Sequence, residues 1–200
     1  MKATRFWNLY APVYNLFMSM NKNAYAEVYK KIRKTIQNKK VLELACGTGL
    51  ISNHVAEVSK TYIATDFAEN MLFQAQRKKS CENLRYMKAN AENLPFENHS
   101  FDVVIISNAL HIMPNPEKVL AEIQRVLKTG GILIAPTFVH ENLNSTGQML
   151  VRMLTVAGIT QSNWNMQEYL DFLKQNHVSV KKKTLLKGAI PLLYTEGVYR

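Results

Sequence analysis

Four short apolar runs are spread along the chain: VLELA at 41–45, TYIAT at 61–65, FDVVII at 101–106 and GILIAPTFV at 131–139. Continuous apolar runs of this length are typical of strands that are buried on both faces. The stretches that separate the runs have helical spacing of apolar residues, near 22–37, 49–58, 69–79 and 117–128. Strands that alternate with helices predict βαβ crossovers and a parallel sheet covered on both sides.

The end of the chain has a different pattern. A weaker strand is expected at 84–88 and a further helix at 166–176. Two β-prone runs, 178–186 and 191–199, are then joined by a short turn, which predicts an antiparallel hairpin. We therefore expect an α/β, doubly wound, Rossmann-like sheet of seven strands, mostly parallel with a C-terminal antiparallel hairpin and helices on both faces.

Nothing in the sequence divides the chain, because it contains no internal repeat and no linker rich in Pro, Ser or Gly. A single domain over residues 1–200 is the expected organisation. The stretch 139–164 is additional material in which Met149, Leu150 and Met153 fall at helical spacing. It is expected either as a small amphipathic helix over the edge of the sheet or as a cover for a substrate pocket.

Composition and charge narrow the class of protein. Of 200 residues, 47% are hydrophobic and 20% are charged, which is ordinary globular composition and excludes intrinsic disorder. The 25 Lys and Arg against 15 Asp and Glu give a net charge of +10, which would attract nucleic acid, an anionic membrane or acidic small molecules without choosing among them. Two cysteines and the absence of a signal-like or spanning apolar stretch favour a cytoplasmic protein.

The most informative motif is the segment 43–49, ELACGTG, whose glycine turn directly follows the first predicted strand. Ligands of open α/β sheets bind at the carboxyl ends of strands, and glycine lets the backbone turn sharply beside them. A dinucleotide fingerprint would need a third glycine where this chain has Ser52, and a phosphate-binding P-loop would need a lysine after Gly49. The carboxylate of Glu43 would also repel a pyrophosphate, whereas it suits a ligand with a cationic amino group.

The segment resembles motif I of the class I S-adenosylmethionine (SAM)-dependent methyltransferases, in which an acidic strand residue precedes a G-x-G turn. The family usually has glycine at the position of Ala45. Similarity continues in order over roughly 41–138, through TDFAENML, NAENLPF, the fourth strand and LAEIQRVLKTGG. The resemblance implies SAM as cofactor, S-adenosylhomocysteine (SAH) as product, and these cofactor-binding residues: Glu43, Ala45, Cys46, Gly47, Gly49, Asp66, Phe67, Met71, Asn90, Ala91, Glu92 and Ser107.

Among these, the resemblance gives Asp66 the ribose hydroxyls and places Phe67 and Met71 along the adenine. Asn90 stands where the family usually has Asp, so its adenine contact would come from an uncharged side chain.

The N-terminal residues 1–20 resemble the Y-x-x-x-A-x-x-Y-D lead-in of the small-molecule, quinone and phospholipid methyltransferases. Tyr10 and Tyr14 occupy the tyrosine places and Asn15 replaces the usual Asp. In those enzymes the segment folds over SAM, so it is expected to form a lid. Packing of its aromatic rings against the core is the alternative. The resemblance makes Tyr14 a candidate for both catalysis and substrate contact, and Tyr10 a candidate for substrate contact.

His111 follows the fourth predicted strand, where the family lines its active site. Histidine can accept a proton near neutral pH, so His111 is the candidate general base and a candidate substrate contact; shaping of the pocket alone is the alternative role. The sequence shows no evident cluster of carboxylates for a metal, and we expect none.

The combined features identify the chain as similar to the methyltransferase-11 type, in the ubiquinone/menaquinone and phospholipid N-methyltransferase branch. A small-molecule or lipid-like acceptor is expected, with an anionic membrane surface as a further partner. Nucleic acid is a less favoured partner, because no base-methylating Pro-Pro motif follows the fourth strand and no RNA-binding module is visible. The alternatives left open are a tRNA or rRNA methyltransferase and a SAM-binding regulatory protein without turnover.

Overall fold

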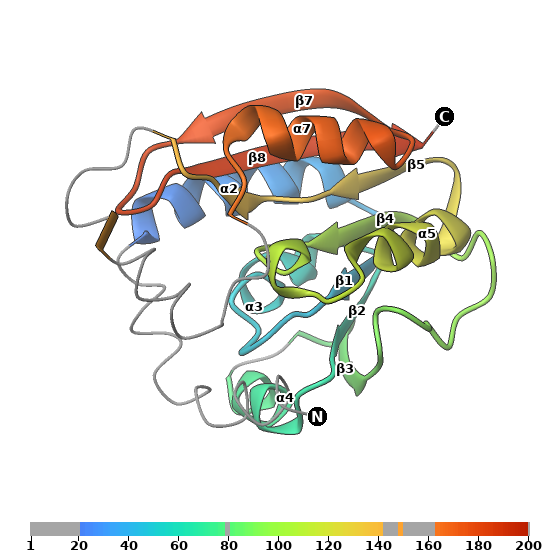
Figure 1. Ribbon diagram of the computed structural model, residues 1–200. Coiled ribbons are helices and arrows are strands. Elements are labelled where there is room, and N and C mark those ends of the chain that lie inside the picture. Colours follow the sequence, from blue (N-terminus) through green and yellow to red (C-terminus); the bar gives the residue numbers. More distant parts are fainter. Residues whose placement is uncertain (1–20, 79–80, 142–147, 150–162, 200) are drawn as a thin grey trace.

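The computed structural model describes residues 21–78, 81–141, 148–149 and 163–199 (Figure 1). The predicted roles of Tyr10 and Tyr14, the lid over 1–20 and most of the stretch 139–164 lie outside the described residues and stay predictions.

The strands form one sheet in which β1 to β5 are parallel. Their bounds are β1 Lys40–Leu44, β2 Thr61–Asp66, β3 Leu84–Lys88, β4 Phe101–Ile106, β5 Leu127–Ile134, β6 Thr137–Phe138, β7 Val178–Leu186 and β8 Leu192–Tyr199. The order is β3-β2-β1-β4-β5-β8, and both β6 and β7 pair with β8. Because β8 is antiparallel to β5 and to β7, the predicted C-terminal hairpin is confirmed.

The sheet has eight strands rather than the expected seven, because the apolar run at 131–139 is divided into the end of β5 and the short β6. Ala135 still donates its N–H to Thr195 at 3.0 Å. Pro136 follows and has no N–H to give to the ladder. Pairing resumes at Thr137, which lies opposite Leu193 of β8.

The helices cover both faces, as predicted. Their bounds are α2 Lys22–Ile36, α3 Ser52–Val55, α4 Glu69–Gln76, α5 Pro116–Val126 and α7 Met166–Gln175, with short 3-10 turns η1 Ala56–Val58 and η2 Leu110–Ile112. Figure 1 shows α2 behind the sheet and α5 and α7 in front of it. The single helix expected at 49–58 is divided into α3 and η1, and the helices expected at 69–79 and 117–128 end at Gln76 and Val126.

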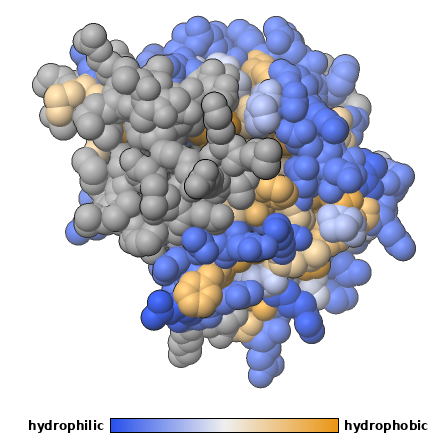
Figure 2. Space-filling model, turned by 60° about the horizontal axis from the view of Figure 1, so that its bottom comes forward, coloured by the Kyte–Doolittle hydropathy of each residue, from blue (hydrophilic) through white to orange (hydrophobic). Residues whose placement is uncertain are grey.

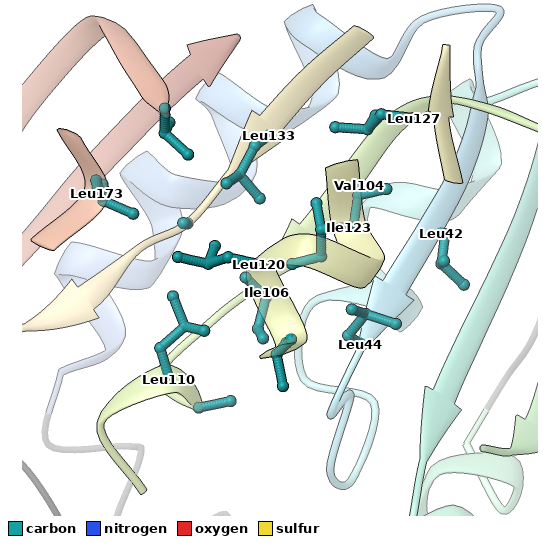
Figure 3. Close-up of a cluster of buried hydrophobic side chains, with 14 of the residues drawn as sticks. Leu42, Leu44, Val104, Ile106, Leu110, Leu120, Ile123, Leu127, Leu133 and Leu173 are labelled. Carbon is teal, nitrogen blue, oxygen red and sulfur yellow. The ribbon is translucent and has the colours of Figure 1, made fainter. Parts of the chain in front are cut away.

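Alternation along the central strands produces two hydrophobic cores. Leu42 and Leu44 of β1 belong to the core under α5 and α7, whereas Val41 belongs to the core under α2 and α3. Figure 3 shows the first core, in which Ile123 of α5 and Leu173 of α7 approach the sheet. Successive side chains of a strand point to opposite faces, so a strand that is apolar at every position requires helices on both sides.

Among the described residues, no helix combines the length and the apolar character that crossing a bilayer would require.

Candidate functional site

A cavity of about 330 Å³ lies at the carboxyl ends of β1, β2 and β4. β1 is flanked by β2 on one side and by β4 on the other. The strands before and after this point are therefore added on opposite sides of β1, and a crevice forms between the strand ends. The cavity is lined by Ala45, Gly47, Asp66, Phe67, Ala68, Met71, Ala89, Asn90, Ala91, Glu92, Ser107, Asn108, Ala109, Ile112, Met113 and Pro114.

The structure brings most of the sequence-predicted cofactor residues together around this one cavity. Ala45, Gly47, Asp66, Phe67, Met71, Asn90, Ala91, Glu92 and Ser107 all line the cavity. Glu43, Cys46 and Gly49 are absent from the lining and lie around the same loop. Cys46 is a buried free thiol, and burial raises its pKa further, so it stays a neutral part of the core.

The glycine loop has the left-handed backbone that its sequence suggested. Gly47 has φ 56° and Gly49 has φ 71°. A Cβ on Gly49 would come within 2.5 Å of the Tyr86 hydroxyl and would also collide with the amide of Asn53. The loop therefore packs against these two side chains only because residue 49 has no side chain. Ala45, where the resembling family has glycine, also has a positive φ, 50°, a conformation that costs a residue with a Cβ roughly 1–2 kcal/mol.

Asp66, at the end of β2, fixes the position of the loop. Its Oδ2 accepts the N–H of Gly47 at 2.8 Å, and its Oδ1 accepts the N–H of Ala68 at 2.8 Å. Burial raises the pKa of Asp66, and these N–H donors act in the opposite direction by stabilising the carboxylate. An ionised carboxyl group has about four lone-pair sites, so Asp66 can still accept hydrogen bonds from a ligand in the cavity.

Glu43 has a different position from the one its sequence suggested. Its side chain is buried beneath the loop, where Oε2 accepts the hydroxyl hydrogen of Tyr62 at 3.0 Å. Burial raises the pKa of Glu43 to about 8, although hydrogen bonds from Tyr62 and Ser52 lower it in part. The group is therefore mainly neutral at pH 7, and it joins β1, β2 and α3 rather than presenting a charge to the cavity.

Ser107 carries a polar atom that has no hydrogen-bond partner among the described residues. Within the described part of the chain, two buried side-chain oxygens have no hydrogen bond, Asn53 Oδ1 and Ser107 Oγ. Of the two residues, only Ser107 lines the cavity. Leaving a buried hydroxyl unpaired costs about 1–3 kcal/mol, so a polar ligand atom that pairs with Ser107 would bind favourably.

The sequence missed the rest of the lining, because these residues carry no recognisable chemistry of their own. They are Ala68, Ala89, Asn108, Ala109, Ile112, Met113 and Pro114, each next to or near a predicted residue in the sequence. Asn108 has φ 48°, donates from Nδ2 to the Tyr25 hydroxyl at 2.6 Å and accepts the N–H of Phe138 at 2.8 Å. It therefore joins the cavity wall to α2 and β6. The signal was its position beside Ser107.

Figure 2 brings forward the side of the molecule that carries α4 and shows apolar side chains gathered among hydrophilic ones. The stretch Ile112, Met113 and Pro114 adds an apolar part to the cavity lining, beside the polar groups of Asp66 and Asn90 in the same lining. Such a pocket suits a ligand that is partly apolar and carries a few polar groups.

His111 lies on η2, immediately before the lining residue Ile112, and is not itself part of the lining. Its Nδ1 is 3.3 Å from Thr137 Oγ1. Burial, helped by the nearby His140, lowers the pKa of His111 to about 4. The imidazole is therefore neutral at pH 7. His140, which the sequence did not single out, also has its pKa lowered by burial.

The described residues contain no group of three or more His, Cys, Asp or Glu side chains that could hold a metal ion.

Comparisons with known proteins agree with this geometry. Residues 42–135 match the model of the family described as a methyltransferase domain. The chain is 31% identical over 140 residues to the demethylmenaquinone methyltransferase of Renibacterium salmoninarum, a match that covers 68% of this chain and 58% of that protein. The chain thus spans less than two thirds of the length of this relative.

Solved structures share the fold. A SAM-dependent methyltransferase from Thermotoga maritima matches with a TM-score of 0.76 at 19% identity, over 98% of this chain and 99% of that one. Magnesium protoporphyrin IX methyltransferase from Synechocystis, solved with bound SAH, matches with a TM-score of 0.69 at 14% identity, over 92% and 87% of the two chains.

The protonation of Glu43 predicts a specific dependence of stability on pH. Its folded-state pKa is about 8 against an ordinary value of 4.5, so between these values the unfolded chain loses a proton that the folded chain keeps. Stability contributed by the protonated group is full below about pH 4.5 and is lost as pH rises toward 8. Glu43→Gln removes this titration. We expect its stability relative to the unchanged protein to increase steadily from pH 5 to pH 8.

Urea midpoints at pH 5, 6.5 and 8 measure this difference. Any constant offset caused by the Gln amide cancels in the slope. Parallel pH profiles of the two proteins would show that Glu43 ionises normally.

Proposed function

We propose that this chain, whose residues 42–135 match the model of a methyltransferase domain, transfers the methyl group of SAM to a small-molecule or lipid-like acceptor. The observation that carries the proposal is a single cavity that is lined both by the glycine loop, through Gly47, and by the strand-end carboxylate of Asp66. Both belong to one hydrogen-bonded unit, because Gly47 donates to Asp66 at 2.8 Å.

The residues present fit SAM chemically. Asp66 has lone pairs left for ribose hydroxyls, and the hydroxyl of Ser107, which no described residue pairs, is available for a polar group of the amino-acid part. Phe67, Met71 and the stretch 89–92 would surround the adenine. Glu43, Cys46 and Gly49 support the loop from beneath, so their contribution to binding is the shape of the backbone at Ala45 and Gly47.

The chemistry asks for orientation more than for a catalytic apparatus. SAM supplies a methyl group on a positively charged sulfur that is already a good leaving group. The chain contributes proximity, alignment and exclusion of water. The apolar stretch Ile112–Pro114 helps to exclude water from the part of the cavity that it lines. If the acceptor arrives protonated, His111, one residue before the lining residue Ile112, is the proposed proton acceptor; the burial that lowers its pKa to about 4 makes it a weaker base than an exposed histidine.

The acceptor class follows from the relatives and from charge. The relative from Renibacterium salmoninarum is named for demethylmenaquinone, a quinone substrate. A net charge of +10 would also bring the protein to an anionic membrane surface, where such acceptors reside. The same charge would favour RNA, which keeps an RNA methyltransferase as the second candidate; a SAM-binding regulator without turnover is the third.

Asp66→Ala tests the cofactor assignment. We expect loss of measurable SAH binding by calorimetry, because the change removes the ribose acceptors and releases the N–H of Gly47. Asp102→Ala is a matched control: Asp102 also accepts a backbone N–H, from Lys40 at 2.8 Å, and pairs with Lys128, but it lies at the opposite end of its strand. Unchanged SAH affinity in folded Asp66→Ala protein would refute the assignment.

A labelled-SAM assay on parallel lipid, small-metabolite and total-RNA extracts tests the acceptor class. We expect label in the lipid or small-metabolite fraction. Label in RNA alone would establish the second candidate, and binding of SAH with no label in any fraction would support the regulator.

His111→Ala tests the proposed proton acceptor. We expect turnover to fall about 100-fold or more, as is typical for loss of a general base, with little change in SAM affinity. Because the pKa of His111 is about 4, the acid limb of the turnover profile should lie nearer pH 4 than pH 6.5. His54→Ala, on α3 away from the cavity lining, is the control. Full turnover in His111→Ala would remove its proposed role.

A further inference from the structure

The connection from β3 to β4, residues 89–100, is the least regular part of the cavity wall. It contains no helix and no strand, only an isolated bridge between Asn90 and Asn93. Its first four residues, 89–92, nevertheless line the cavity. Backbone N–H and C=O groups near the interior require hydrogen-bond partners, and here regular secondary structure does not supply them.

Two side chains of α5 supply those partners. Glu122 Oε2 accepts the N–H of Leu94 at 2.7 Å, and Arg125 Nη2 donates to the C=O of Leu94 at 3.0 Å. Arg125 Nη1 also donates to the C=O of Phe96 at 2.7 Å and to Asn98 Oδ1 at 3.0 Å. The connection is thus held to α5 at Leu94, Phe96 and Asn98.

The two side chains also bind each other in a bidentate ion pair. Arg125 Nε lies 2.7 Å from Glu122 Oε1, and Arg125 Nη2 lies 2.8 Å from Glu122 Oε2. The Arg125 guanidinium lowers the pKa of Glu122, and the pair is half-buried, with side-chain exposures of 31% and 17%. A planar guanidinium can make all these contacts at once, whereas a lysine ammonium cannot reproduce the fork.

Glu122 and Arg125 together form a clamp on the connection, and this clamp lies close to the cavity. Leu94 is buried in the core, and Glu92, two residues earlier, lines the cavity. Glu92 is itself held near the start of α5: Asn115 Nδ2 donates to its carboxylate at 3.2 Å, and Lys118 Nζ lies 3.9 Å from it. Both ends of the segment 92–94 are therefore held by side chains at the start of α5 or within it.

We propose that Arg125 and Glu122 are positioning residues for cofactor binding. They fix the segment 89–92 so that its backbone and side chains meet the nucleoside part of the ligand, although neither residue lines the cavity. The inference rests on the proposed function, because it assumes SAM in this cavity. A role in stability alone is the competing explanation, and it predicts that folded variants bind SAH with unchanged affinity.

The test compares Arg125→Lys and Glu122→Gln with Arg33→Lys. The control also alters an arginine that pairs with a glutamate, Glu57 at 2.8 Å, and donates to a carbonyl, that of His54 at 3.0 Å, but it lies on α2. Calorimetry measures the Kd of SAH and of 5′-methylthioadenosine, which lacks the amino-acid part, at a temperature where circular dichroism shows each variant folded.

We expect both ligands to bind about tenfold more weakly to Arg125→Lys, because several charge-assisted hydrogen bonds to the segment are lost. The loss should be the same for SAH and for 5′-methylthioadenosine, and Arg33→Lys should remain within twofold. Hydrogen exchange should accelerate at residues 89–100 but not in β1. Glu122→Gln, which keeps its side-chain length, decides by the same criteria if Arg125→Lys does not fold.

Affinity within twofold of the unchanged protein in a folded clamp variant would overturn the proposal. A loss seen with SAH but absent with 5′-methylthioadenosine would also overturn it, because the effect would then lie away from the nucleoside. Failure of the unchanged protein to bind SAH would refute the proposed function instead, and the exchange rates of residues 89–100 would still show whether the clamp holds the segment.

Discussion

The hydrogen bonds of the Asp66 carboxylate set the geometry on which the site depends. One oxygen holds the N–H of Gly47 and the other holds the N–H of Ala68, both at 2.8 Å. The first bond joins the loop after β1 to the end of β2. The second holds Ala68, the residue that directly precedes α4. Because Gly47 and Ala68 both line the cavity, a single side chain fixes two segments of its lining.

The parallel sheet explains where charged and polar side chains lie in the structure. Central strands that are apolar on both faces leave no room for charged groups in the interior except at strand ends, where loops supply hydrogen bonds. Glu43 lies just inside this boundary, and burial keeps it mainly protonated at pH 7. Asp66 lies at the boundary, where N–H donors support its ionised form. Among the described residues, Lys22, Lys30, Lys34, Lys118 and Lys174 are exposed on helices and Lys181–Lys183 are exposed on β7, so these positive charges face solvent.

The connection between β3 and β4, which contributes residues 89–92 to the cavity lining, depends on α5 in two ways. Its apolar face, including Leu120 and Ile123, is buried in the core shown in Figure 3. Its polar side chains Glu122 and Arg125 then hold the irregular connection between β3 and β4. A helix that is fixed by hydrophobic packing can thus hold in place a loop that has no regular structure of its own.

The sequence by itself determined the order of strands and helices and the pairing of a glycine turn with a strand-end carboxylate, because apolar periodicity and turn residues act locally. It also located Ser107 and the stretch 90–92 through their resemblance to a family. Only the tertiary structure decided that burial raises the pKa of Glu43 beside Tyr62, that the hydroxyl of Ser107 has no partner among the described residues, and that Arg125 holds Leu94. These properties depend on burial and on contacts between residues far apart in the chain, which no local pattern specifies.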